Sequence, residues 1–253
     1  MISFIRILKD SDNHERVKPD FSEEIRIFPY SKEFSIKRKG SIKEIRVKGH
    51  PGFVRLFDIA SLVSEKKILL YLSERNKKNL LEIKKVSKEL FKDEKLFCLS
   101  FSTNEIPRLI YKKKYGALTC LWESNDFNKI DQIPFFNREC FALSKRVFFK
   151  LGGFSTRFFH KYYHDVDISI RARKKGYKLI LLNQKNISRI NDDTKIFDPF
   201  YKESNRVALN MRHLKRRDKI RNLAFTLKET PCLIKQKRFL EVTGRFHGLV
   251  KNA

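Results

Sequence analysis

The sequence has few cysteines and no long apolar run. Its four cysteines, Cys98, Cys120, Cys140 and Cys232, are far apart, and no two have metal-finger spacing. We therefore expect buried, reduced thiols rather than disulfides or a structural zinc site. No apolar run approaches the roughly 20 residues of a membrane-spanning helix, and the start MISFIRILKDSD lacks the pattern of a signal peptide. These absences predict a cytoplasmic protein, either soluble or peripheral on a membrane.

Acidic residues are also scarce. The 253 residues include 29 Asp and Glu against 56 Lys and Arg, which gives a formal net charge of +27. Such a surplus indicates an anionic partner, such as nucleic acid, phospholipid headgroups or a phosphate-bearing small molecule, although a solvated basic surface without a partner has the same composition. Nucleic-acid binding rests on charge alone, because the sequence has no metal finger, RNP-like strand or recognisable helix-turn-helix.

The apolar content of 41 % is enough to fill the core of one large domain. In the first half, β-branched and continuous apolar runs alternate with segments of helical periodicity. The predicted strands are 2–8, 24–28, 42–47, 68–72 and 96–101, and the predicted helices are 53–65 and 80–90. Alternating strands and helices of this kind predict an α/β domain with a mostly parallel sheet and right-handed crossovers.

The second half is less regular. The run LIYKKKYGALTCLWES predicts two short strands or a hairpin, and a short helix is expected between Ser144 and the glycines at 152 and 153. A further helix is expected from Asp165 or Val166 to Lys175, with Gly176 as its stop and YKLILL as the next strand. Two amphipathic helices are predicted after residue 200, where the apolar positions are Val207, Met211, Leu214, Ile220, Leu223, Ala224 and Leu227. We therefore divide the chain into a domain of residues 1–199 and a basic helical appendage, 200–253, packed on it.

Two carboxylates, Asp165 and Asp167, open the predicted helix in the segment KYYHDVDISIRARKKGYKL, residues 161 to 179. In a first helical turn, carboxylates are stabilised by unpaired backbone N–H groups and by the positive end of the dipole. The same position also suits a carboxylate that accepts a proton from a bound hydroxyl group. Both interpretations stay open on these residues alone.

A longer pattern surrounds the two carboxylates in ALSKRVFFKLGGFSTRFFHKYYHDVDISIRARKKGYKLILL, residues 142 to 182. An arginine-containing helix leads to a Gly-Gly-Phe turn, an aromatic pair, an acidic D-x-D and an R…G pair before a strand. The matching residues are Gly152, Gly153, Phe154, Phe158, Phe159, Asp165, Asp167, Arg171 and Gly176. This pattern resembles the second half of family 2 glycosyltransferases, which have the GT-A fold and use nucleotide-sugar donors. Fainter similarity upstream and in YKESNRVALNMRHL extends the resemblance to about residues 49 to 215.

The resemblance implies a GT-A-like fold, with a mostly parallel central sheet flanked by helices and C-terminal amphipathic helices. It also implies a nucleotide-diphospho-sugar donor. Asp165 matches the carboxylate that deprotonates the acceptor hydroxyl in inverting members. The implied substrate-binding residues are Asp167, His164, Arg171, Trp122 and Gly153, and the implied diphosphate-binding residues are Ser73, Glu74, Arg75 and Arg189. His164 can instead be a polar cap of the helix, without contact to substrate. Trp122 can instead pack in the protein interior.

Three positions depart from the family's pattern. The metal-binding D-x-D falls at Ser73-Glu74-Arg75, the Glu of the later E-D-x-D is His164, and a histidine that can complete the metal site aligns with Arg189. Only Glu74 in that motif offers a carboxylate to Mg²⁺ or Mn²⁺. Either arginine guanidinium groups replace the cation at the diphosphate, or the chain is an inactive relative, or the first motif is misaligned.

The sequence thus predicts a hexosyltransferase-like enzyme that transfers a sugar to a glycan or lipid-linked acceptor in cell-surface polysaccharide synthesis. From residue 200 onward, 14 Lys and Arg stand against 4 acids, which suits the inner face of an anionic membrane. Two alternatives remain: a catalytically inactive binding or scaffold protein with the same fold, and a basic nucleic-acid-binding protein.

Overall fold

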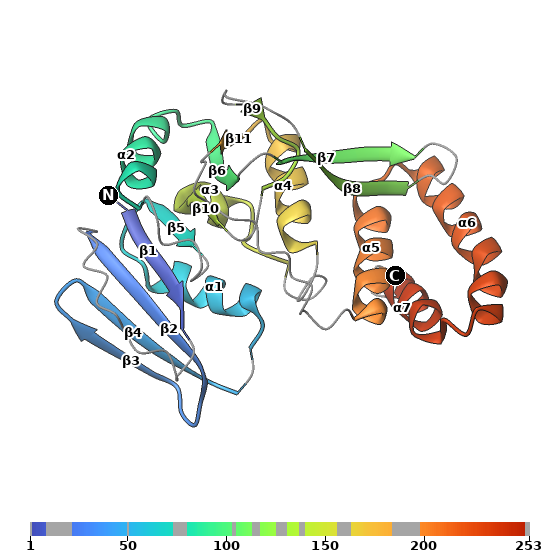
Figure 1. Ribbon diagram of the computed structural model, residues 1–253, viewed down its shortest axis with the longest axis horizontal. Helices are drawn as coiled ribbons and strands as arrows, with labels where there is room; N and C mark the ends of the chain where they lie inside the picture. Colours follow the sequence, from blue (N-terminus) through green and yellow to red (C-terminus); the bar gives the residue numbers. More distant parts are fainter. Residues whose placement is uncertain are drawn as a thin grey trace.

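The structure is a computed structural model of the chain (Figure 1). It describes residues 2–8, 22–49, 51–72, 80–102, 105–112, 117–124, 131–136, 140–155, 163–183 and 198–250.

A nine-stranded mixed sheet forms the centre of the described structure, in the order β3-β4-β2-β1-β5-β10-β6-β11-β9. Its strands are β1 (Ile2–Ile7), β2 (Glu23–Ser31), β3 (Ser35–Lys39), β4 (Ile42–Lys48), β5 (Ile68–Leu72), β6 (Leu96–Ser102), β9 (Asp131–Gln132), β10 (Cys140–Ser144) and β11 (Lys178–Asn183). The pairings β2–β4, β1–β2, β1–β5 and β6–β11 are parallel, whereas β10 runs antiparallel between β5 and β6. Since β5 and β6 are both antiparallel to β10, they run in the same direction as each other. Six strands therefore share one direction, and their carboxyl ends lie at one edge of the sheet: β4, β2, β1, β5, β6 and β11.

Helices cover both faces of this sheet. On one face pack α1 (Phe53–Val63), α3 (Lys145–Lys150) and α4 (His164–Lys174), and on the other packs α2 (Leu80–Leu90). In β5, Leu69 belongs to the first core and Leu70 to the second, and neither is exposed. Because successive side chains of a strand point to opposite faces, a continuous apolar run such as ILLYL requires cover on both sides.

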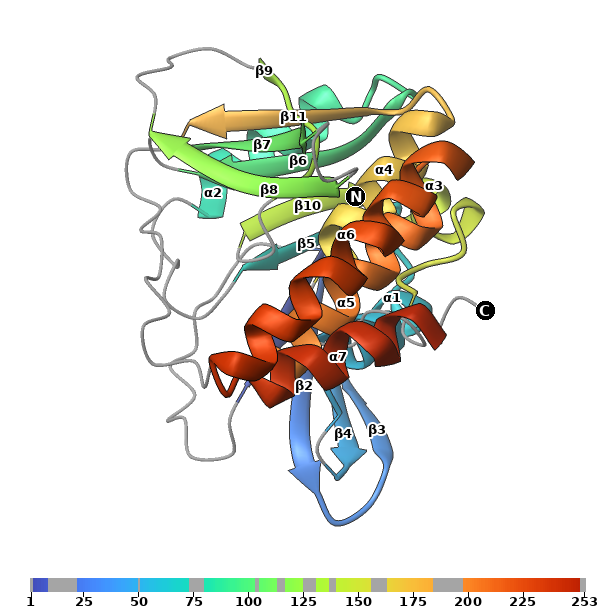
Figure 2. The ribbon, with the colours of Figure 1, turned by 90° about the vertical axis from the view of Figure 1, so that its right-hand side faces the viewer.

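The remaining elements lie beside this layered core (Figures 1 and 2). A separate hairpin, β7 (Glu105–Lys112) and β8 (Ala117–Ser124), packs on α4 and on α5 (Pro199–His213) through a small apolar cluster. The backbone N–H of Leu118 donates to Asn210 Oδ1 of α5 over 2.6 Å. Two further helices follow, α6 (Arg216–Lys235) and α7 (Phe239–Val250).

Helix α7 packs closely on α5 because it presents two glycines, one turn apart, to that helix. A Cβ at Gly244 would lie 2.3 Å from the carbonyl oxygen of Phe200, and one at Gly248 would lie 2.3 Å from that of Ser204. Only glycine allows this approach of the two backbones. The α5–α7 pair therefore forms a rigid support for α6.

The sequence predicted most of these elements to within a few residues, including the mostly parallel sheet, the hairpin and the helix at Asp165. It missed β3, β9, β10 and α7. Of the apolar positions named for the second C-terminal helix, Ile220 and Leu227 are exposed rather than packed on the core. The polar segment from Lys9 to Phe21 lies outside the described residues.

Candidate active site

The strand order reverses beside β1, whose neighbours β2 and β5 lie on opposite sides of it. In open α/β sheets, ligands bind outside the carboxyl ends of the strands at such a reversal. Helices α1 and α4 each lead into a parallel strand, β5 and β11, so both helices begin at this carboxyl edge. Their first turns carry the positive ends of the helix dipoles. The fold therefore places Asp165, in the first turn of α4, at the edge where a ligand site is expected.

An aromatic cluster joins the two helix starts to the end of β5. Phe53 opens α1, and its ring centroid lies 5.0 Å from that of Tyr71 and 5.5 Å from that of His164. Phe154, from the Gly-Gly-Phe turn, lies 5.2 Å from the His164 ring at 84°. His164 is 1 % exposed, so the structure places it beneath the edge as a packing partner, and a direct contact with substrate stays a prediction.

Asp165 is partly exposed in the first turn of α4. The helix begins after Tyr163, whose backbone is left-handed with φ of 65° and which donates no side-chain cap. Burial raises the pKa of the Cys120 thiol to about 12, and the nearby Asp165 carboxylate adds to this shift. Asp165 therefore lies near Cys120 of β8, where the hairpin packs on α4.

Asp167, two residues further along, is fully buried and fixed by four side chains. Its Oδ2 accepts from Ser155 Oγ at 3.0 Å and from Arg171 Nε at 3.0 Å. Its Oδ1 lies 2.7 Å from His213 Nε2 and 3.4 Å from Arg212 Nη1. Burial acts to raise the pKa of Asp167, but the His213 hydrogen bond and the charges of Arg171 and Arg212 outweigh burial and lower the pKa. Asp167 thus anchors α4 to the end of α5.

Arg171, the arginine of the R…G pair, binds the Gly-Gly-Phe turn, which explains why the two parts of the sequence pattern occur together. Besides Asp167, its guanidinium group donates to the carbonyl oxygens of Leu151 and, at 2.8 Å, of Gly153. Gly152 and Gly153 have φ of 81° and 65°, a backbone that side chains disfavour. The arginine therefore holds the carbonyls of a glycine turn, and it contacts both of the other predicted residues, Asp167 and Gly153.

The sequence analysis missed Asp58, which lies on α1 behind this turn. It accepts the backbone N–H of Phe154, and burial raises its pKa to about 6. Its Oδ1 has no hydrogen-bond partner among the described residues. A Cβ at Gly153 would lie 3.6 Å from that oxygen. A carboxylate inside the apolar sequence LFDIA was the one available signal for a buried acid.

The residues assigned to the diphosphate, Ser73, Glu74, Arg75 and Arg189, lie outside the described residues, as does the side chain of Trp122. The first three directly follow β5 in the sequence. Within the described ranges, no cluster of three His, Cys, Asp or Glu side chains could hold a metal ion. A hydroxyl, one carboxylate and a guanidinium cation form a poor donor set for Mg²⁺ or Mn²⁺, which bind several oxygen anions. The residues at this position do not fit the cation.

No family model and no curated protein matches the sequence. Many solved structures match it by fold, and three of them have 10 to 13 % sequence identity with it. The mannosyltransferase PcManGT from Pyrobaculum calidifontis, in complex with GDP-Man and Mn²⁺, gives a TM-score of 0.53 at 10 % identity over 99 % of this chain and 86 % of that chain. TarS from S. aureus gives 0.51 at 11 % identity over 90 % and 72 %.

The third structure is GalNAc-T7 with UDP, GalNAc and Mn²⁺, with a TM-score of 0.50 at 13 % identity over 84 % of this chain. This chain spans about half of that protein, 51 % of its length. All three are glycosyltransferases of the GT-A fold. Their folds match the fold described above over 84 to 99 % of this chain, at low sequence identity. The chain therefore has the GT-A glycosyltransferase fold, in a divergent form.

Proposed function

We propose that the protein transfers a sugar from a nucleotide-diphospho-sugar to a hydroxyl group of a glycan or lipid-linked acceptor, in the manner of family 2 glycosyltransferases. Cell-surface polysaccharide synthesis at the inner face of the membrane is the process that suits this acceptor. The GT-A fold supports glycosyl transfer in general, and two of the similar structures contain UDP or GDP-Man. The finer assignment rests on the sequence pattern around residues 142 to 182.

The observation that carries the proposal is the different environment of two carboxylates on one helix. Asp167 is buried and held by basic and hydroxyl side chains, whereas Asp165 is partly exposed at the carboxyl edge of the sheet. An alcohol is a weak nucleophile at neutral pH, and a positioned base accelerates its attack by about 10²- to 10⁴-fold. Asp165 is the carboxylate that an acceptor hydroxyl can reach, and Asp167 is a positioning residue.

The positioning has a direct structural route. Asp167 connects α4 to His213 of α5 and, through Arg171, to the carbonyls of the glycine turn. These contacts fix the start of α4, which carries Asp165, against α5 and the glycine turn. General-base catalysis requires such fixed geometry, because small displacements of the reacting groups lower the rate strongly.

The leaving nucleoside diphosphate develops negative charge that the site must neutralise. We assign this role to Arg75 and Arg189, because guanidinium groups bind phosphate oxygens with two parallel hydrogen bonds. Ser73 and Glu74 complete the segment after β5. No step of this proposal uses a metal ion, since the donor set there does not fit one.

A second candidate function is donor or glycan binding without transfer. The loss of two aspartates from the first motif, at Ser73 and Arg75, favours it. Isothermal titration with UDP-, GDP- and dTDP-sugars, with Mn²⁺ or with EDTA, followed by transfer assays, separates the two. Donor binding in EDTA together with turnover supports a metal-independent transferase. Binding without turnover of any donor supports the second function. Absence of all nucleotide binding contradicts both the transferase and a donor-binding protein, and leaves only glycan binding.

A further inference from the structure

Helix α6 has its apolar side turned away from the rest of the protein. Ile220, Leu227 and Ile234 are 61 %, 50 % and 45 % exposed. They are seven residues apart, which is about two helical turns, so they form one line along the helix. The opposite side of α6, which faces α5 and α7, buries the polar side chains of Asn222 and Thr226 together with one apolar side chain, Leu233. This is the reverse of the usual arrangement for a helix packed on a core.

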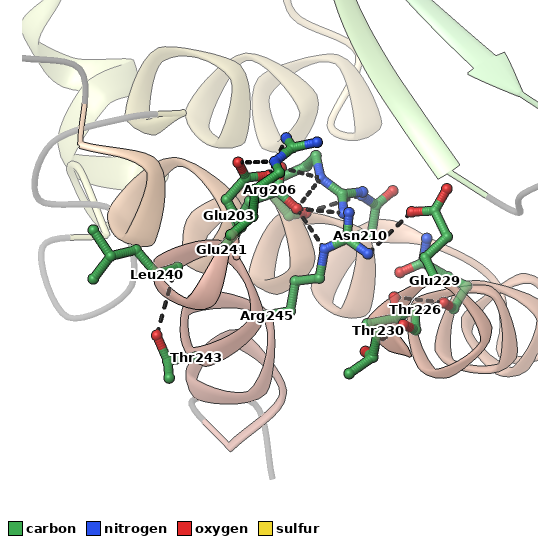
Figure 3. A network of polar contacts seen from close by, with 12 residues as sticks. Glu203, Arg206, Asn210, Thr226, Glu229, Thr230, Leu240, Glu241, Thr243 and Arg245 are labelled. Carbon is green, nitrogen blue, oxygen red and sulfur yellow. Dashed lines mark hydrogen bonds and ion pairs between the residues drawn. The ribbon is translucent and has the colours of Figure 1, made fainter. Parts of the chain in front are cut away.

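A polar network fixes α6 in this orientation (Figure 3). Arg245 of α7 is buried, and its guanidinium group binds Glu203 of α5 at 2.8 Å and Glu229 of α6 at 3.0 Å. Arg206 of α5 binds the same Glu203 at 2.9 Å. Rotating α6 to bury its apolar line would remove Glu229 from Arg245, and leaving a buried cation with less compensation is costly. The outward apolar line is therefore part of the folded state.

Helix α7 also exposes apolar side chains. Its Gly244 side faces α5, while Phe239, Phe246 and Val250 lie along its outer side. Their spacings of seven and four residues place them in one line, and Val250 is 73 % exposed. Soluble proteins seldom leave several large apolar side chains together in water unless a partner covers them. We name the exposed apolar side chains of the two helices, with the cations beside them, the outer α6–α7 surface.

A row of cations borders the apolar line of α6. Arg217, Arg221, Lys228 and Lys235 follow one another at spacings of four and seven residues, so they lie along one flank of the helix. Nine lysines and arginines and only two acids occur between residues 215 and 238. None of Arg217, Lys228 and Lys235 forms an ion pair with another described residue. An apolar line beside a cationic row is the pattern of a helix that lies in a bilayer interface.

We propose that the outer α6–α7 surface docks on an anionic phospholipid bilayer. Apolar side chains enter the headgroup boundary and the cation row binds lipid phosphates. A second copy of the chain fits this surface poorly, because it carries the same net charge of +27 and the same cations. A neutral protein partner would leave the cation row unused. None of the described helices is long and apolar enough to cross a membrane, and docking at the surface requires no crossing.

This surface is connected directly to the candidate active site. His213, the last residue of α5, binds Asp167, and α6 begins three residues later at Arg216. Figure 2 shows α5, α6 and α7 side by side on the flank of the molecule next to α4. The docking does not depend on glycosyl transfer, so it can be tested without a donor.

The first test is co-sedimentation of the full chain with vesicles of phosphatidylglycerol and phosphatidylcholine, compared with vesicles of phosphatidylcholine alone. We expect binding to the anionic vesicles that weakens with added salt. The apolar variant is Ile220→Ser, Leu227→Ser, Ile234→Ser. Its matched control replaces three exposed apolar side chains elsewhere on the molecule and is Phe34→Ser, Leu62→Ser, Leu81→Ser. The apolar variant should lose at least about ten-fold in partitioning, and the control should bind like the wild type.

The second test removes charge and leaves the apolar line intact. The variant Arg217→Gln, Lys228→Gln, Lys235→Gln should weaken binding to anionic vesicles by roughly 100-fold. The matched control removes three exposed lysines of β3 and α2 and is Lys37→Gln, Lys39→Gln, Lys85→Gln. Circular dichroism checks that all variants are folded.

Three results would overturn the proposal. In the first, the wild type does not bind anionic vesicles. In the second, the apolar variant or the α6 charge variant binds them as strongly as the wild type. In the third, the α6 charge variant and its lysine control weaken binding equally. The last result would mean that overall charge drives adsorption. Sedimentation velocity adds a further decisive outcome: a wild-type dimer that the apolar variant dissociates, without vesicle binding, would assign the surface to self-association.

Discussion

Replacing Asp167 by asparagine removes one negative charge and leaves a side chain of nearly the same shape. In the folded protein this carboxylate is 0 % exposed and neutralises Arg171 and Arg212. Asparagine can still accept a hydrogen bond from Ser155, but it offers no charge to the two guanidinium groups. The variant therefore isolates the electrostatic part of the anchor between α4 and α5.

The expected loss of stability in Asp167→Asn follows from the burial of this ion pair. Removing one partner of a buried ion pair costs about 3–5 kcal/mol, and the retained hydrogen bonds place Asp167→Asn near the lower end. For a domain of this size each kcal/mol lowers Tm by about 2–4 °C, so we expect a decrease of roughly 6–12 °C. Asp165→Asn is the matched control on the same helix, since a first-turn charge contributes about 0.3–1 kcal/mol.

Thermal and urea unfolding followed by circular dichroism measure both variants. The folded-state pKa of Asp167 is lowered, so its contribution is present above the pKa of an unfolded carboxyl group and is lost as the pH falls through the folded value. The difference between Asp167→Asn and wild type should therefore shrink below about pH 4. Equal stability of wild type and variant at neutral pH would refute the anchoring role, as would a larger loss from Asp165→Asn.

Other predictions concern the turn, the helical support and the metal. Burial raises the pKa of Asp58 to about 6, so ionisation of Asp58 lowers the stability of the folded protein as the pH rises toward that value. Asp58→Asn should therefore be more stable than the wild type well above this pKa. A stability gain of the variant that persists in acid would contradict this reasoning. Gly244→Ala places a methyl group against the Phe200 carbonyl and should cost at least about 1–3 kcal/mol in urea unfolding, whereas Thr243→Ala on the exposed side should not. Donor affinity in calorimetry should be unchanged by EDTA, because Glu74 alone cannot hold a divalent cation, and a strict Mn²⁺ requirement would contradict the arginine assignment.

The sequence predicted those parts of the fold that depend on local pattern. The run at Leu69 and Leu70 predicted a strand buried on both faces, and Gly176 predicted the end of α4, because both signals lie within a few residues. Strand β10 was missed, since CFALS is short and the antiparallel direction depends on partners far along the chain.

The contacts of the site could not be predicted in the same way. The pattern around Asp167 indicated an acid at a helix start, but its partner His213 is 46 residues away. Periodicity identified the apolar line at Ile220 and Leu227, yet periodicity cannot say which side of a helix meets the rest of the protein. The orientation of α6 depends on buried Arg245, which pairs with Glu203 of α5 and Glu229 of α6. The residues next to Arg245 in the sequence do not predict these ion pairs.

The role of Asp165 is tested most directly by single-turnover transfer with saturating donor, once an accepted donor is known, comparing wild type with Asp165→Asn. The account predicts a rate lower by about 10²- to 10⁴-fold, with donor affinity and Tm close to those of the wild type. A variant that transfers sugar as fast as the wild type would show that the base is not Asp165.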